Sequence, residues 1–321
     1  TNTNFCKKGE TVKNFKRWLF AAFLLAAGMF TNPVSEAHAE AKIKVVATLS
    51  TFADLVKKIG GDRVQVHTVA SPRFNPHFIE PKPSDVLRTS QAELFVHAGL
   101  DLEAGRAPLV EAAANIKILP GGEGDLDLSQ GITLLEQPTQ PISRSQGDIH
   151  LFGNPHYWLN PENGKIMARS IADKLSQMDP EHQTEYQENL SKFLERLDGK
   201  IAEWKIRVQP DKGKEAIAYH NEWPYLAEFA GVKIAQFLEP KPGIPPTPRH
   251  LAFLEGYIKK NSIPAIFQAT FYSKDAAKAL EKRTGIKLYL LCANVGEIKE
   301  AEDFFSFFDY NMDTIAKAFA Q

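Results

Sequence analysis

The sequence predicts an α/β protein with two lobes, each built on a parallel β-sheet flanked by helices, joined by one long backbone helix. Two observations lead to this fold class. Short apolar segments alternate with helical ones on both sides of the middle of the chain, which is typical of parallel sheets. Between these regions, residues 179–208 carry apolar side chains three or four positions apart, as a helix requires. With 321 residues, 43% of them hydrophobic, the chain is long enough for two lobes.

The first 39 residues have the pattern of a secretory signal peptide. Basic residues precede an apolar run at 18–30, and the segment ends with the small-x-small cleavage pattern Ala37-His38-Ala39. The run of about 13 residues is shorter than the roughly 20 that a membrane-spanning helix needs. We therefore expect residues 1–39 to be cleaved and the mature protein to be periplasmic. No cysteine stands at the cleavage point, which argues against a lipid anchor.

Composition excludes several classes of protein. The formal net charge is −1, so no broad basic field is present to hold a nucleic acid. Two cysteines, Cys6 and Cys292, cannot build a disulfide framework or a cysteine-rich zinc module. The residues from Val12 onward read like a natural signal start, and we expect translation to begin there from an alternative initiation codon. Cys6 would then never be made.

The N-terminal lobe is expected at 40–178. Apolar, β-branched segments predict strands at 42–50, 64–70 and 93–99. Segments with helical spacing predict helices at 51–61, 82–92 and 163–179. Residues 120–147 are rich in glycine, proline and glutamine and are expected to form a surface loop, with "ITLLE" as the one possible strand.

The linking helix is expected at 179–208, where Asp179-Pro180 is a typical helix start. At about 1.5 Å per residue it would be about 40 Å long, enough to run between two domains. The C-terminal lobe, at 209–321, repeats the alternation of strands and helices. Its strands are expected at 215–220, 233–238, 265–270 and 287–292, and its helices at 224–231, 247–261, 273–285 and from Ala301 to the end.

Three histidines lie in comparable places. His77 follows the second strand in a proline-rich loop, His156 lies in "GNPHYWLNP", and His220 ends a strand. The carboxyl ends of parallel strands form the crevice where ligands bind, so these imidazoles could converge on one metal ion. Tyr157 and Trp158 are expected to pack beneath His156 and stiffen its loop.

The other histidines have more ordinary explanations. We expect His67 and His97 to be sheet residues, His182 to be a solvated helix residue, and His250 to lie near a helix start. His150 is interpreted as a loop residue, although it lies only six positions before His156.

Three motifs, taken in order around the long helix, resemble the zinc- and manganese-binding solute-binding proteins of bacterial ABC transporters. The motifs are "HFIEPKPSD" with His77, "PHYWLNP" with His156 and "YHNEWPYLAEFAG" with His220; "DYNMDTIAKAF" is similar to the family's C-terminal end. The resemblance covers nearly all of residues 42–321. It implies a metal site between two lobes, with these three histidines as ligands.

The sequence departs from the family at the fourth ligand. The family often has an aspartate after the last strand, where this chain reads "LLCANVGEIKE". The fourth ligand is therefore left open among Cys292, Asn294, Glu80, Glu222, Glu239 and water. Asn160 also replaces the usual aspartate of the second motif. The loop at 121–147 lacks the histidines that some zinc-binding members carry there.

The resemblance implies a receptor rather than an enzyme. It would capture Zn²⁺ and deliver it to a membrane permease, acting as a monomer. Three neutral imidazoles favour zinc over manganese, which prefers oxygen ligands. Metal affinity should fall below about pH 6.5, where imidazoles gain protons. The alternatives are a Mn²⁺ receptor, a binder of metal chelates and, from another class, a zinc hydrolase; His-Glu-x-x-His is absent from the sequence.

Overall fold

The computed structural model describes residues 1–2, 41–140 and 150–320. The predicted signal segment, with Val12 and Cys6, lies outside these residues except for its first two positions. In the described part of the chain, no helix has both the length and the apolar character needed to cross a membrane.

The first sheet contains four parallel strands in the order β2-β1-β3-β4. These are β1 (Ile43–Ala47), β2 (Val64–Thr68), β3 (Leu94–His97) and β4 (Asp125–Asp127). Val45 lies opposite Val66 on one side and Leu94 on the other, so β1 is central and apolar, as expected of a strand covered on both faces. β4 corrects the sequence prediction, which placed residues 125–127 in a loop and the one possible strand of this region at "ITLLE", where the structure has none. Its three residues are too few to produce a readable pattern.

The second sheet repeats this topology in the order β6-β5-β7-β8, again with all strands parallel. Its strands are β5 (Glu215–Ala218), β6 (Lys233–Phe237), β7 (Ala265–Ala269) and β8 (Lys287–Leu291). The predicted α/β class with two parallel sheets is therefore confirmed. In each sheet, the next two strands along the chain lie on opposite sides of the first one: β2 and β3 flank β1, and β6 and β7 flank β5. In parallel sheets, ligands bind beyond the carboxyl ends of the strands where the strand order reverses in this way.

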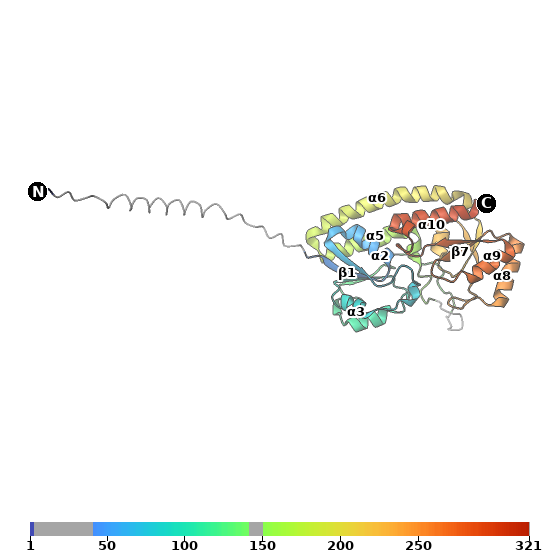
Figure 1. Cartoon of the computed structure of the whole chain (residues 1–321), viewed down its shortest axis with the longest axis horizontal. Helices are drawn as coiled ribbons and strands as arrows, with labels where there is room; N and C mark the ends of the chain where they lie inside the picture. The colour runs from blue at the N-terminus through green and yellow to red at the C-terminus, as the bar shows by residue number, and fades with distance from the viewer. Residues whose placement is uncertain (3–40, 141–149, 321) are drawn as a thin grey trace. The chain divides into compact units, whose positions relative to one another are not determined.

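Helices cover the two sheets, as Figure 1 shows. Those of the first half are α2 (Ser50–Gly60), α3 (Pro83–Ser90), α4 (Arg106–Ala113) and α5 (Pro161–Met178). Those of the second half are α7 (Pro224–Ala230), α8 (Pro248–Asn261), α9 (Asp275–Thr284) and α10 (Phe304–Phe319). Asn160 is the N-cap of α5, and its side chain accepts a hydrogen bond from the Glu162 N–H at 2.9 Å. Asparagine and aspartate cap helices equally well, which explains why this departure from the family motif is tolerated.

The long helix is α6 (Gln183–Val208), which runs along both halves of the described chain (Figure 1). It begins after a 3-10 turn at Pro180–His182, slightly later than predicted. Near its start, the Asn189 side chain donates to the Ile59 carbonyl at 3.0 Å, which joins α6 to α2. Near its end, Trp204 Nε1 donates to Asp309 Oδ1 at 2.8 Å, which joins it to α10. The long-helix prediction is thus confirmed, and α6 is packed against helices at both ends.

One continuous hydrophobic core joins the two sheets. It includes Val45 of β1, Phe267 of β7 and Phe304 of α10, together with the buried face of α6. Residues 42–321 accordingly form one compact unit. The predicted limits at 40–178, 179–208 and 209–321 stay predictions.

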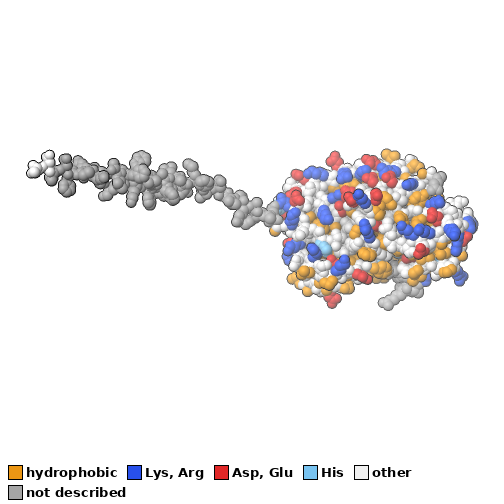
Figure 2. Space-filling model, in the orientation of Figure 1, with side chains coloured by type: hydrophobic (Ala, Val, Ile, Leu, Met, Phe, Trp, Pro, Cys, Tyr) orange, Lys and Arg blue, Asp and Glu red, His pale blue; other side chains and the backbone are white. Residues whose placement is uncertain are grey.

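On the face seen in Figure 2, basic and acidic side chains are interspersed.

Candidate metal centre

The loop that carries His77 is short and locally fixed. His77 lies in a 3-10 turn at Pro76–Phe78, beyond the carboxyl end of β2. Asn75 caps this turn, because its side-chain oxygen accepts a hydrogen bond from the His77 N–H at 3.0 Å. The His77 carbonyl also accepts from the Ala104 N–H at 3.2 Å. His77 itself is only 6% exposed, so its ring points into the protein.

The loop around His156 is held by its aromatic residues, as the sequence predicts. Tyr157 and Trp158 are completely buried. The Tyr157 hydroxyl donates to the Ala98 carbonyl at 2.9 Å, just after β3 of the first sheet. Trp158 Nε1 donates to the Ala293 carbonyl at 2.8 Å, just after β8 of the second. These two side chains therefore tie the loop to both sheets.

The imidazole of His156 is oriented by its own loop. Asn154 Oδ1 accepts from the His156 N–H at 3.1 Å and lies 2.9 Å from Nδ1. An amide oxygen can only accept, so Nδ1 carries the proton and Nε2 keeps its lone pair. This tautomer is the one that can bind a metal through Nε2.

His220 is oriented in the same way by a neighbouring strand end. It follows β5, and its Nδ1 lies 2.8 Å from Oε2 of Glu239, which follows β6. Glu239 is also fixed by the N–H of Gly243 at 3.2 Å. A histidine whose Nδ1–H donates to a carboxylate is a common arrangement at metal sites, because it fixes the ring and raises the basicity of Nε2.

The structure brings His77, His156 and His220 together. One ligand nitrogen from each lies within 4.8 Å of the others, and all three residues are buried. Nε2 of His77 is 3.0 Å from Nε2 of His156. Two nitrogens bound to one tetrahedral zinc ion lie about 3.3 Å apart, so this spacing is close to that of a metal site.

Burial keeps two of these rings in the metal-binding protonation state. It lowers the pKa of His77 well below 6.5, with smaller contributions from His220 and His150. Burial also lowers the pKa of His156, reinforced by His77, His220 and His150. A charged imidazolium is disfavoured in so dry a place beside other imidazoles. Both side chains are therefore neutral at neutral pH, as a metal ligand must be.

The side chains considered for the fourth ligand lie elsewhere or are engaged. Cys292 is fully buried, its pKa is raised by burial, and its N–H donates to Asn311. Glu80 is exposed, and Glu239 is bonded to His220. Asn294 Oδ1 lies 3.4 Å from the hydroxyl of Thr51. Cys292, Glu80, Glu222 and Glu239 are not among the residues whose ligand atoms group with those of the three histidines.

Glu222 is buried, and burial raises the pKa of its carboxyl well above the usual value, with help from Glu297 and Glu239. A protonated carboxyl is a poor ligand for a divalent metal.

A fourth histidine, His150, lies in a loop, as predicted, and that loop brings it beside the cluster, although its ligand nitrogens are not among those that group within 4.8 Å. Its ring centroid is 5.0 Å from that of His77 and 6.4 Å from that of His156. With His156 and His220 it lines a pocket beside the cluster. The available signal was the occurrence of two histidines, six positions apart, in one glycine- and proline-rich loop.

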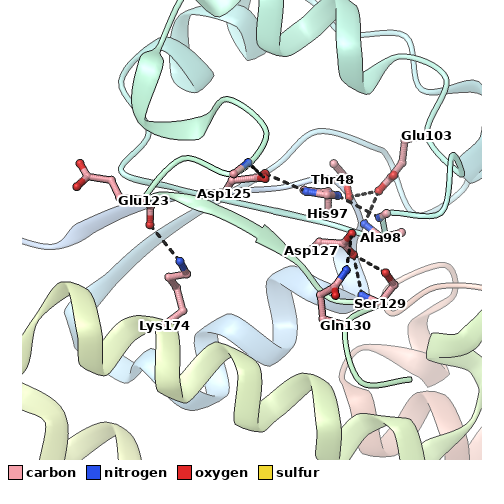
Figure 3. Close-up of polar contacts among 12 residues, drawn as sticks. Thr48, His97, Ala98, Glu103, Glu123, Asp125, Asp127, Ser129, Gln130 and Lys174 are labelled. Carbon is pink, nitrogen blue, oxygen red and sulfur yellow. Dashed lines mark hydrogen bonds and ion pairs between the residues drawn. The ribbon is translucent and has the colours of Figure 1, made fainter. Parts of the chain in front are cut away.

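The remaining described histidines have structural partners. His67 and His97 lie in β2 and β3, as predicted. His67 is hydrogen-bonded to Asp85, and His97 to Asp125. His182 is hydrogen-bonded to Asp179, and His250 to the Phe237 carbonyl. Figure 3 shows His97 directed at Asp125, and Glu103 accepting from Thr48 and from the backbone of Ala98. This network fixes the end of β3, where Tyr157 is bonded.

Comparisons with known proteins found a matching family model, similar sequences and a similar structure. The sequence model of the family described as "Zinc-uptake complex component A periplasmic" (ZnuA) matches residues 45–318. The manganese ABC transporter substrate-binding lipoprotein PsaA of Streptococcus anginosus is 30% identical over 87% of this chain and 90% of its own length. The metal ABC transporter substrate-binding lipoprotein ScbA of Streptococcus cristatus is 29% identical over 94% of this chain and 97% of its own. A crystal structure of ZnuA, 26% identical, superposes with a TM-score of 0.72 over 86% of this chain and 99% of that one.

Proposed function

The chain belongs to the ZnuA family of periplasmic zinc-uptake components, and we propose that it captures Zn²⁺ at His77, His156 and His220. As a member of this family it is the substrate-binding component of a metal ABC transporter and is not an enzyme. The cluster of three buried ligand nitrogens within 4.8 Å of one another carries the proposal. A hydrolase is excluded by the family.

Zinc is favoured over manganese by the chemistry of the donors. All three clustered ligands are imidazole nitrogens, whereas Mn²⁺ prefers carboxylate, carbonyl and water oxygens. The carboxylate of Glu239 is bonded to His220 Nδ1 and therefore acts behind the ligand nitrogen. Manganese is the second candidate, because PsaA, a relative of this chain, is named a manganese-transporter protein.

Delivery requires that the loaded protein meet a membrane permease outside the cytoplasm. We propose that the segment 1–39 directs export to the periplasm and is then removed, and that the protein works as a monomer. We also propose that release occurs by local movement of the loops around His77 and His156, because the core shared by the two sheets opposes a rotation of one lobe against the other.

Competition titration of the metal-free protein with Zn²⁺ and Mn²⁺ tests the proposal. We expect one equivalent of zinc to bind, at least about 100-fold more tightly than manganese. His77→Ala, His156→Ala and His220→Ala should each weaken zinc binding strongly, while His182→Ala, which removes an imidazole bonded to Asp179 outside the cluster, should not. Tighter binding of manganese would overturn the choice of metal. Unchanged zinc affinity in all three cluster variants would overturn the site.

A further inference from the structure

His150 has an unused buried nitrogen beside the three clustered histidines. Its Nδ1 lies 2.8 Å from Oδ1 of Asp101, so the Nδ1–H donates a hydrogen bond to the carboxylate, and in the neutral ring Nε2 keeps a lone pair. Nε2 is buried and has no hydrogen-bond partner among the described residues. Leaving a buried acceptor unpaired costs free energy, and such an atom in a folded protein calls for an explanation.

The position of Asp101 is built by an unusual backbone. Gly99, Leu100 and Asp101 have φ values of 65°, 53° and 55°, so three consecutive residues adopt the left-handed conformation. That conformation is unfavourable for Leu100, whereas aspartate adopts it more readily, and such strain is concentrated at functional sites. The turn carries the Asp101 carboxylate to His150, and its second oxygen accepts from the Leu151 N–H at 3.3 Å. One carboxylate thus holds both the side chain and the following backbone.

The distances place His150 beside the cluster, outside the group of three whose ligand nitrogens lie within 4.8 Å of one another. Imidazoles bound through nitrogen to one tetrahedral zinc ion have ring centroids about 5 Å apart. The centroids of the three clustered rings are separated by 5.0, 5.4 and 5.6 Å. His150 lies 5.0 Å from His77 and 6.4 Å from His156. To bind the same ion, His150 therefore needs to move toward His156 by at least about 1 Å and to turn out of its 25° stacking on His77.

We propose that His150 is the fourth metal ligand, so that the ion is bound by four imidazoles, with Asp101 orienting the fourth. This inference rests on the proposed function. It supplies a fourth ligand in a chain that lacks the aspartate often found after the last strand in the family. It makes the role of Asp101 toward His150 equivalent to that of Glu239 toward His220. The two carboxylates offset the charge of the bound ion from behind the rings. An all-nitrogen donor set strengthens the preference for zinc over manganese.

The direct test is a crystal structure of the protein loaded with zinc. We expect Nε2 of His150 to lie about 2.0–2.1 Å from the ion, as the other three do. An ion bound by His77, His156 and His220, with water or a carboxylate in the fourth position, would overturn the proposal and leave the proposed function standing. A protein that holds no zinc at this cluster would overturn both.

Zinc competition titration of His150→Ala and Asp101→Asn gives a second measurement, with circular dichroism to confirm that each variant folds. We expect His150→Ala to weaken zinc binding by more than about 100-fold and Asp101→Asn by about 10- to 100-fold. His182→Ala is the matched control, since it removes an imidazole that also pairs with an aspartate. Wild-type affinity in His150→Ala, with binding lost in His77→Ala, would refute the fourth ligand alone.

Discussion

Replacing Gly164 by alanine tests how tightly α5, α6 and α10 are packed together. A Cβ atom built at Gly164 lies 2.5 Å from Cζ and 3.3 Å from Cε1 of Phe304, and 3.4 Å from a methyl carbon of Leu197. Two carbon atoms do not approach within 3.0 Å without displacement. The Phe304 ring is confined between Phe193, at 5.5 Å between centroids, and Phe308, at 5.0 Å. It cannot move aside without disturbing the shared core.

The magnitude follows from a matched comparison with Gly199→Ala in α6. A Cβ at Gly199 meets no atom within 4 Å, so this variant gains only helix propensity, about 1 kcal/mol. Gly164→Ala makes the same propensity change but adds an overpacking cost of about 1–3 kcal/mol. Because propensity largely cancels between the two variants, their difference in free energy of unfolding measures the clash.

The assay is urea unfolding followed by circular dichroism and by tryptophan fluorescence, to check that both report one transition. We expect Gly199→Ala to be more stable than the wild type and Gly164→Ala to be less stable than Gly199→Ala by about 1–3 kcal/mol. Equal stability of the two variants would show that the helices separate freely at Gly164. The inference of one rigid core behind the metal site would then be wrong.

Three further predictions concern the site and its surroundings. Three imidazoles of ordinary pKa would cost zinc affinity about 10³-fold between pH 7.5 and 5.5. Because burial lowers the pKa values of His77 and His156, we expect a smaller loss in competition titrations, and a full thousandfold loss would contradict the assigned burial. Glu239→Gln removes the charge that orients His220 and should weaken zinc binding about 10- to 100-fold by the same assay, with an unchanged affinity counting against its role. Cys292 should resist thiol reagents in the native protein and react in urea, as judged by mass spectrometry of its peptide, because it is buried and its pKa is raised; rapid native labelling would disprove this.

The pH prediction revises the one made from sequence. An imidazole of ordinary pKa starts to compete with metal near pH 6.5, and sequence provides no reason to expect otherwise. Burial among other imidazoles favours the neutral rings of His77 and His156, so protons compete for them only at lower pH. The sign is therefore the same as predicted, and the onset moves downward.

Local patterns in the sequence determined the secondary structure and the three motif histidines. Alternating apolar segments record which faces are buried, and this information is local, so β1 or α6 could be recognised without knowing its neighbours. The same holds for His77, His156 and His220, each of which lies in a loop beside a recognisable motif. The short strand β4 lacked such a pattern and was missed.

The tertiary structure alone decided which side chains meet. His150 and Asp101 are separated by 49 residues along the chain, and His220 and Glu239 by 19, yet each pair is 2.8 Å apart. Those contacts depend on how strand ends and turns are packed against one another, which no local periodicity encodes. The continuous core joining the two sheets has the same origin, since it requires helices far apart in sequence to share one buried surface. The sequence thus identified most of the strands and helices and the three motif histidines. Tertiary packing paired Glu239 with His220 and Asp101 with His150, and it placed His150 beside the other three imidazoles.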